Sequence, residues 1–352
     1  MKKRNTPVSF LCHWFREKRK SVIIVFASFF ILASIFFFLL FLFYIYVPLN
    51  PYSQEKIVFT VYKGWGDEEV ARNLKAAGII RSDYFFRIYT LLSLKHHLLK
   101  AGTYELSPRM SVYQIVDKMK KGEVIKNKIT ILEGWDLKKI GAYLESKNIC
   151  SNQEFFSIVQ KNFLNDFDFL KDKPPDADLE GYLFPDTYEI VEGEGCEKII
   201  RRMLSNFDQK LTPELREEIN KQGKTIFEII IMASILEKEA KREEDKRIIS
   251  GILWKRIQAN MPLQVDATVN YITGKNLPAI SLQDKEIDSP YNTYKYKNLP
   301  KGPISTPSLE SIKAAIYPKE SHFWYYLSTP EGEIIFSKTF EEHKIAKQKY
   351  LR

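Results

Sequence analysis

Hydrophobic positions first gather in one uninterrupted run, residues 21–47. These 27 residues contain no charged side chain and include eight phenylalanines. A membrane-spanning helix needs about 20 apolar residues, so the run predicts a transmembrane helix. A cleavable signal peptide has a shorter apolar region that ends in small residues, whereas Tyr44, Tyr46 and Pro48 stand at the exit of this one. Aromatic residues there are typical of a membrane interface, which predicts an uncleaved anchor.

A second hydrophobic pattern, residues 226–241, predicts a helix that is buried on most sides. Positions 229–236 are all apolar or small, and two carboxylates follow at once, Glu237 and Glu239. Each continues a stripe of the helix: Glu239 that of Met232, Ile235 and Leu236, and Glu237 that of Ile230, Ala233 and Ser234. A carboxyl group beside apolar surface has a raised pKa, which makes it a candidate general acid. The competing interpretation, which the pattern alone favours, is a helix that leaves the core as an exposed charged face.

A strand–turn–helix pattern occurs more than once. Residues 57–62 alternate as a strand, Gly64-Trp65-Gly66 makes a turn, and Asp67 is placed to cap a helix through Ala77. The same unit returns later in the chain: Gly64, Trp65, Val70, Leu74 and Ile79 match Gly134, Trp135, Ile140, Leu144 and Ile149. A weaker third copy has its strand at 102–106 and a helix from Ser111 through Met119. Such units predict small α+β modules.

The repeated modules allow two interpretations. They form either a surface that binds an extended polymer or a spacer that holds the C-terminal region away from the membrane. Trp65 and Trp135 are similarly open to a role in stacking on sugars, but their matched strand–helix junctions favour a place in the core.

The rest of the chain predicts a mixed architecture, so the fold class is α+β. Residues 150–225 read as helical and irregular, and their run EGYLFPDTY (180–188) lines a cleft or forms a packed loop. Further on, the expected elements are a helix at 243–260, a short helix with Asp266 at its N-cap, an aperiodic segment at 288–307, a helix from Thr306-Pro307 to Tyr317, a hairpin of 323–328 with 334–337, and a terminal helix at 340–350.

Charge is concentrated at one end of the chain. The formal net charge is +9, and residues 1–20 alone carry seven Lys or Arg against one Glu. The remaining 332 residues therefore carry only +3, so a nucleic-acid partner is not supported. A basic cluster before a membrane helix predicts a cytoplasmic N-terminus, which places everything after Pro48 outside.

Cysteine usage argues against a metal centre or a disulfide framework. The chain has three cysteines, and only Cys150 and Cys196 lie beyond the predicted anchor. They are able to pair, but the sequence leaves this open.

Several motifs occur in a fixed order along the chain. They are GTYELSPRMS (102–111), EGYLFPDTY (180–188), ASILEKEA (233–240), MPLQVDATVNY (261–271), SPYNTY (289–294), LPKGPISTPS (299–308) and A-A-x-x-P (314–318). Together with the N-terminal membrane helix, this set resembles the endolytic murein transglycosylases, the YceG-like family. The resemblance covers roughly residues 55–350.

The resemblance implies cleavage within nascent peptidoglycan strands, at the β-1,4 bond after N-acetylmuramic acid, leaving 1,6-anhydro ends. It implies that Glu239, the second Glu of the E-K-E run, is the catalytic acid. Gln264, Asp266, Asn292 and Thr293 match polar positions that line the family's substrate groove. Many members have Thr or Ser after the catalytic Glu, whereas this chain has Ala240. The implied partners are glycan strands, the cytoplasmic membrane and peptidoglycan synthases, with no cofactor or metal.

The implied domains are a basic cytoplasmic tail (1–20), the anchor (21–47), a LysM-like module (55–125), a second α+β and helical region (126–225) and the catalytic region (226–352). Ordinary glycosidases need two carboxylates, but a transglycosylase works with one, because the sugar's own C6 hydroxyl replaces water. A hydrolase would instead need a second acid, such as Asp266 or Glu180. The alternative from another class is a non-catalytic, membrane-anchored scaffold that binds glycans.

Overall fold

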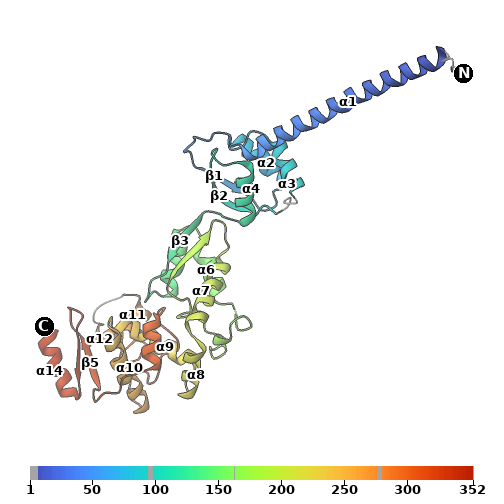
Figure 1. The fold of residues 1–352 in the computed structure, drawn as a ribbon. Helices are drawn as coiled ribbons and strands as arrows, with labels where there is room; N and C mark the ends of the chain where they lie inside the picture. Colours follow the sequence, from blue (N-terminus) through green and yellow to red (C-terminus); the bar gives the residue numbers. More distant parts are fainter. Residues whose placement is uncertain (1–6, 94–97, 162, 276–279, 352) are drawn as a thin grey trace. The chain divides into compact units, whose positions relative to one another are not determined.

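The computed structural model describes residues 7–93, 98–161, 163–275 and 280–351, and it has the predicted α+β architecture (Figure 1). Two compact units make up the chain. The N-terminal unit extends to Lys126, and the C-terminal unit runs from Asn127 to Arg352.

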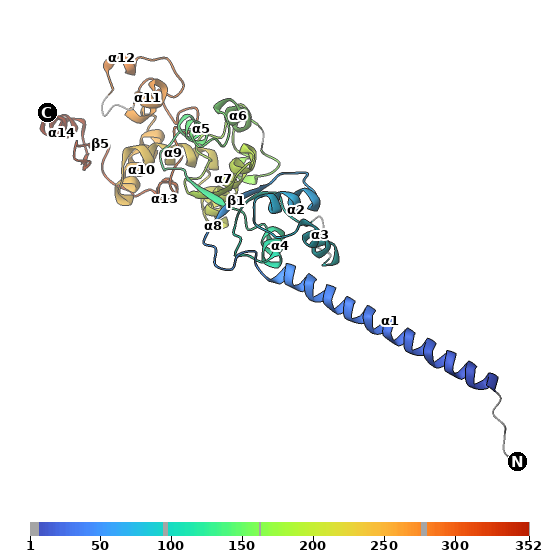
Figure 2. The ribbon, with the colours of Figure 1, turned by 90° about the horizontal axis from the view of Figure 1, so that it is seen from above.

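The N-terminal unit begins with α1 (Pro7–Tyr46), a straight helix that extends away from the rest of this unit (Figure 1, Figure 2). Its segment Val25–Tyr46 has a mean hydropathy of 2.8 and is the one helix among the described residues that is long and apolar enough to cross a membrane. Its last turn is fixed to the unit, because Phe85 stacks on Tyr44 with ring centroids 4.3 Å apart and Arg81 donates to the Val47 carbonyl (2.7 Å). An apolar helix of this kind suits a membrane anchor.

A small module follows α1 in the same unit. Strands β1 (Ile57–Val61) and β2 (Gly102–Leu106) pair antiparallel, with Ile57 opposite Leu106 and Val61 opposite Gly102. Its helices are α2 (Asp67–Ala76), α3 (Asp83–Leu92) and α4 (Val112–Lys121). The first and third copies of the repeat therefore share one two-stranded sheet and one core. Gly66, not Asp67, is the N-cap of α2, and its N–H donates to Glu69 (2.9 Å).

The second copy of the repeat opens the C-terminal unit. Strand β3 (Lys126–Thr130) runs into α5 (Leu137–Ser146) and pairs with β4 (Thr187–Val191). The helical and irregular stretch also contains α6 (Asn152–Val159), η1 (Asp168–Leu170), α7 (Cys196–Lys210) and α8 (Pro213–Lys221). Within the run 180–188, Tyr182 is fully buried and stacks with Phe169. The packed-loop interpretation of this run is the one that the structure supports.

The two repeat tryptophans are packing residues. Trp65 and Trp135 are both half-buried against a hydrophobic core. They contact Tyr62 and Tyr143 edge-to-face, with ring centroids 5.1 and 5.2 Å apart. Both tryptophans thus pack as the matched junctions predict, but with different partners, because Tyr62 precedes Trp65 in the chain whereas Tyr143 lies on the helix that follows Trp135.

Helix α9 (Ile226–Glu239) lies at the centre of the second half of this unit, in contact with α10 (Glu243–Gln258), α11 (Asp266–Thr273) and α13 (Leu309–Ile316) (Figure 1, Figure 2). Every residue from Ile229 to Leu236 is buried, which confirms the helix predicted from the apolar run. A capping box of Thr225 and Glu228 starts it. The remaining elements are α12 (Leu282–Lys285), β5 (Tyr325–Ser328), β6 (Ile334–Ser337) and α14 (Phe340–Tyr350).

Two further predicted helix starts are wrong, each because a long-range contact takes the residue. Helix α13 begins after Ser308 rather than at Pro307, since the Thr306 backbone pairs with Trp135 (2.6 Å) and Gly134 (2.8 Å). Asp266 is the first residue of α11 rather than its N-cap, which is Val265. The Asp266 carboxylate accepts from the Tyr294 hydroxyl instead of capping the helix.

Cys150 and Cys196 form a disulfide, with Cα atoms 5.6 Å apart. The bond links the chain just before α6 to the first residue of α7. The sequence alone left it open whether these two cysteines pair. Disulfides persist in oxidising compartments, so this pair suits a protein region outside the cytoplasm.

Candidate active site

The two carboxylates in the last turn of α9 point in different directions. Successive residues of a helix are about 100° apart, so Glu237 and Glu239 differ by about 200°. Their surroundings therefore differ completely, and the structure distinguishes two residues that the sequence pattern leaves equivalent.

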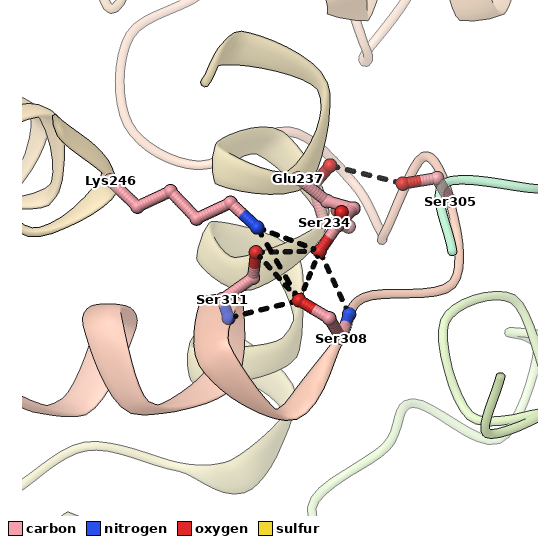
Figure 3. Close-up of polar contacts among 6 residues, drawn as sticks. All are labelled: Ser234, Glu237, Lys246, Ser305, Ser308 and Ser311. Carbon is pink, nitrogen blue, oxygen red and sulfur yellow. Dashed lines mark hydrogen bonds and ion pairs between the residues drawn. The ribbon is translucent and has the colours of Figure 1, made fainter. Parts of the chain in front are cut away.

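Glu237 anchors the start of α13 (Figure 3). Its Oε2 accepts from the backbone N–H of Ser308 (2.8 Å) and from the hydroxyls of Ser308 (2.5 Å) and Ser311 (2.6 Å). The ammonium of Lys246, whose side chain is only 3% exposed, lies 3.3 Å from the same oxygen. Burial opposes ionisation of Glu237, but these donors outweigh it and lower its pKa below the usual value. A carboxylate held ionised in this way is not a general acid.

The segment that carries these serines is tied to α9 one turn earlier as well. The Ser234 hydroxyl accepts from the Ile304 N–H (3.0 Å). The Ser305 hydroxyl donates to the Ser234 carbonyl (3.1 Å) (Figure 3). The chain from 304 to 308 thus runs along the C-terminal half of α9 and fixes the position of its last turn.

Glu239 occupies the opposite kind of environment. Its Oε2 accepts from the Tyr326 hydroxyl (3.0 Å), and the backbone N–H of Ala267 also bonds to it. Burial raises its pKa to about 7, and the nearby Asp266 charge adds to the rise, while the two hydrogen bonds only partly offset it. Near neutral pH a large fraction of Glu239 therefore keeps its proton, as a general acid requires.

Tyrosines and an arginine that the sequence did not single out surround this carboxyl. Burial and the Asp266 carboxylate raise the pKa of Tyr294, and burial together with Glu239 raises that of Tyr326, so both hydroxyls remain donors. Arg256 donates to the carbonyls of Leu263 (2.7 Å) and Trp324 (2.9 Å). It thereby ties the segment before α11 to the β5 hairpin. A tyrosine in a strand usually indicates packing, so the sequence offered no distinct signal for Tyr326.

The four predicted groove residues lie on two neighbouring segments. Thr293 is buried, and its hydroxyl accepts from the Val265 N–H (3.0 Å) and bonds to Thr268 (3.0 Å). Buried Asn292 donates to the carbonyls of Lys285 (2.9 Å) and Ile287 (2.8 Å). The Thr293 side chain therefore holds the segment that carries Asp266, and the Asn292 side chain holds its own loop, residues 285–292.

Gln264 and Asp266 are the more accessible pair of the four. Gln264 is exposed and has a positive φ of 53°, a conformation that non-glycine residues rarely adopt. Its N–H is held by the Thr293 carbonyl (3.0 Å). Half-buried Asp266 follows two residues later, beside Glu239. Strained backbone of this kind is common at binding sites.

Glu180 is unsuited to act as a second, ionised acid. It is buried, and burial raises its pKa to about 8. Its Oε2 accepts from the Leu137 N–H (3.1 Å) and the Tyr271 hydroxyl (3.3 Å), so it joins the start of α5 to α11. A neutral, buried carboxyl does not activate water, which leaves Asp266 as the carboxylate available beside Glu239.

Comparison with known proteins defines the class. The model of the YceG-like family matches residues 59–349, and the chain belongs to this family, which confirms the resemblance seen in the motifs. The endolytic murein transglycosylase of Bacillus subtilis (strain 168) is 31% identical over 319 residues, covering 86% of this chain and 87% of that protein. The endolytic murein transglycosylase of Streptococcus pneumoniae serotype 2 (strain D39) is 30% identical over 326 residues, and the match covers 84% of this chain but only 59% of that protein. A crystal structure of a YceG-like protein from Listeria monocytogenes is 33% identical, with a TM-score of 0.57, and covers 84% of this chain and all of that one.

Proposed function

We propose that this protein is an endolytic murein transglycosylase, a lyase that cuts glycan strands between N-acetylmuramic acid and N-acetylglucosamine. The observation that carries the proposal is Glu239, a partly buried carboxyl whose pKa is raised to about 7. It lies in the last turn of α9, which the Ser308 segment contacts on one side and Tyr326 on the other. The names of its relatives in Bacillus and Streptococcus agree with this activity.

One carboxyl group is sufficient for the reaction. Glu239 donates its proton to the glycosidic oxygen, and the bond from that oxygen to C1 of N-acetylmuramic acid breaks, releasing N-acetylglucosamine with a free 4-hydroxyl. The C6 hydroxyl of the same muramic acid then bonds to C1 and gives its proton to Glu239, which restores the acid. Because the attack is intramolecular, it gains the high effective concentration of a tethered nucleophile. Tyr326 and the Ala267 N–H stabilise the carboxylate between the two steps.

In this proposal, the rest of the chain binds and positions the substrate. Gln264 and Asp266 contact the strand, while Thr293 holds their segment in place and Asn292 holds the loop that carries Thr293. The module at 55–125, which we take as LysM-like, binds glycan near the membrane, and synthases that make the strands are the partners. Residues 126–225 and 226–352 together form the catalytic part, sharing one hydrophobic core.

Muropeptide analysis separates the enzyme from a glycan-binding scaffold. The full chain in detergent is incubated with long, peptide-bearing strands, and the products are separated by mass. Shorter strands with new anhydro ends support the enzyme. Strands that bind but keep their length would support the scaffold.

The activity is expected to fall as pH rises above about 7, because deprotonated Glu239 cannot start the reaction. The Tyr326 hydrogen bond lowers the pKa of Glu239, so Tyr326→Phe should raise that pKa and move the alkaline limb to higher pH. Rates on murein strands between pH 5 and 9 measure this. Tyr325→Phe is the matched control, since that ring stacks on His343 instead of contacting Glu239. An alkaline limb that stays in place in Tyr326→Phe contradicts the assignment.

We also propose that the basic tail, residues 1–20, lies in the cytoplasm and that everything after Pro48 lies outside. A phosphatase reporter fused after Arg352, active only outside the cytoplasm, should be active. A fluorescent reporter that folds only in the cytoplasm should stay dark at the same position. The reverse pattern would place the candidate active site in the cytoplasm, away from the cell wall, and would contradict the proposed function.

A further inference from the structure

A pocket beside Glu239 has a basic lining that the proposed reaction does not use. It has a volume of about 270 Å³ and is lined by the first turn of α5, the last turn of α9 and residues of α11. Its charged lining residues are Lys138, Lys139, Lys238 and Asp136, a net charge of +2. Charged groups of one sign converging from two helices indicate a site for the opposite charge.

The lysines of this pocket are only partly neutralised within the protein, by the single carboxylate of Asp136. Asp136 is committed to capping α5, because its carboxylate accepts from the Lys139 N–H (2.8 Å). In the part of the chain that the structure describes, no ion pair is found for Lys138 or Lys139. Lys238 donates to the neutral Gly134 carbonyl (3.2 Å). Desolvation and then the Lys139 ammonium lower the pKa of Lys238, and the charges of Asp136 and Glu237 only partly offset this, so an anion in the pocket would stabilise the charged form.

The pocket adjoins the acid of the proposed reaction. Lys238 directly precedes Glu239, and Ala267, which lines the pocket, bonds to Glu239 through its N–H. A group bound here therefore belongs to a sugar next to the bond being cut. In murein the charged groups on such sugars are carboxylates, carried by the lactyl substituent of muramic acid or by the peptide attached to it. Lysine ammonium groups bind carboxylates through charge-assisted hydrogen bonds.

We propose that this pocket is a subsite for a carboxylate borne by the muramic acid beside the scissile bond, and that Lys138 and Lys139 bind it. The inference rests on the proposed function. Two sources share the chemistry: the carboxylates of the peptide, and the lactyl carboxylate that is freed when the peptide is removed.

Three strand preparations distinguish these sources. The first bears intact peptides, the second bears peptides whose carboxylates are blocked as amides, and the third is stripped of peptides and carries free lactyl carboxylates. kcat/KM is measured on each with the wild type, with Lys138→Ala/Lys139→Ala, and with Lys147→Ala. The last is the matched control, since Lys147 follows the far end of α5 and lies over Tyr143.

The wild type should prefer intact over blocked strands by about tenfold, the size expected for hydrogen bonds to a charged group. The double variant should lose this preference and cut blocked strands as fast as the wild type does. Lys147→Ala should keep the preference. A lysine-dependent preference for stripped strands assigns the lactyl carboxylate instead of the peptide.

Two results would overturn the subsite. One is a double variant that cuts all three preparations as the wild type does, and the other is a variant slowed equally on all three. The same strands are also tested for binding to each protein. A wild type that cuts no strand but binds charged strands through Lys138 and Lys139 would overturn the proposed function and support the anion site.

Discussion

Replacing Glu239 by glutamine is expected to lower the turnover of murein strands at least ~10²-fold, in the range that general acids contribute. Glutamine keeps the size of the side chain and accepts from Tyr326, but it has no proton to give. The fold should survive, because the burial that raises the pKa of Glu239 makes its ionised form costly to the native state. The melting temperature of the variant should equal or exceed that of the wild type at pH 8, and this difference should vanish well below pH 4.5, where Glu239 is protonated in both the folded and the unfolded chain.

Glu237→Gln is the control for this result, two residues away on the same helix. It weakens the anchor of α13 and leaves Lys246 buried without its charged partner, which should cost about 2 kcal/mol of stability. In the wild type the pKa of Glu237 is lowered. The charge of Glu237 therefore stabilises the fold above the ordinary carboxyl pKa, and this stabilisation is lost as the pH falls below that value. Turnover per folded molecule should change much less than in Glu239→Gln. If Glu237 proved essential and Glu239 dispensable, the acid would be misassigned by two residues.

The second large effect concerns the ends that cleavage leaves. Every new end should be a 1,6-anhydro sugar, lighter than a reducing end by one water, if the C6 hydroxyl is the nucleophile. Digesting long, peptide-bearing strands in water enriched in heavy oxygen and weighing the ends by mass spectrometry measures this directly. Anhydro ends without heavy oxygen are expected, because the C6 hydroxyl is tethered to the reacting sugar and so has a high effective concentration. Glu180, which is neutral at the relevant pH, cannot act as a base for water.

Reducing ends that carry heavy oxygen would show hydrolysis instead. Asp266 would then be the base, since it is half-buried beside Glu239 and accepts from Tyr294. Asp266→Asn would be expected to abolish such hydrolysis, whereas a transglycosylase should retain part of its activity in that variant.

The sequence was sufficient for features that depend on neighbours in the chain. The buried helix α9, the strand–helix repeats and the apolar helix α1 all follow from local periodicity, and the motifs identified the family. The choice between Glu237 and Glu239 does not follow, because both continue apolar stripes of one helix. What separates them is Ser308 on one side and Tyr326 on the other, and neither contact has a local signature.

Two of the three errors in the helix starts have the same origin. Thr306-Pro307 has the composition of a helix start, but its backbone is used to pair with Gly134 and Trp135. Asp266 has the composition of an N-cap, but its carboxylate is used by Tyr294. The basic pocket also escaped notice, because Lys138 and Lys238 are about a hundred residues apart and meet only in the folded chain.

The contacts that complete the site come from far along the chain, so the site is completed only late in synthesis. Ser308 reaches Glu237 across 71 residues, and Tyr326 reaches Glu239 across 87. Contacts of such long sequence separation form late, because the intervening loop must close first. A chain delivered only as far as α11 carries Glu239 but neither of these partners. Under the topology proposed above, Glu239 therefore lacks its Tyr326 partner until the chain has crossed the membrane as far as β5.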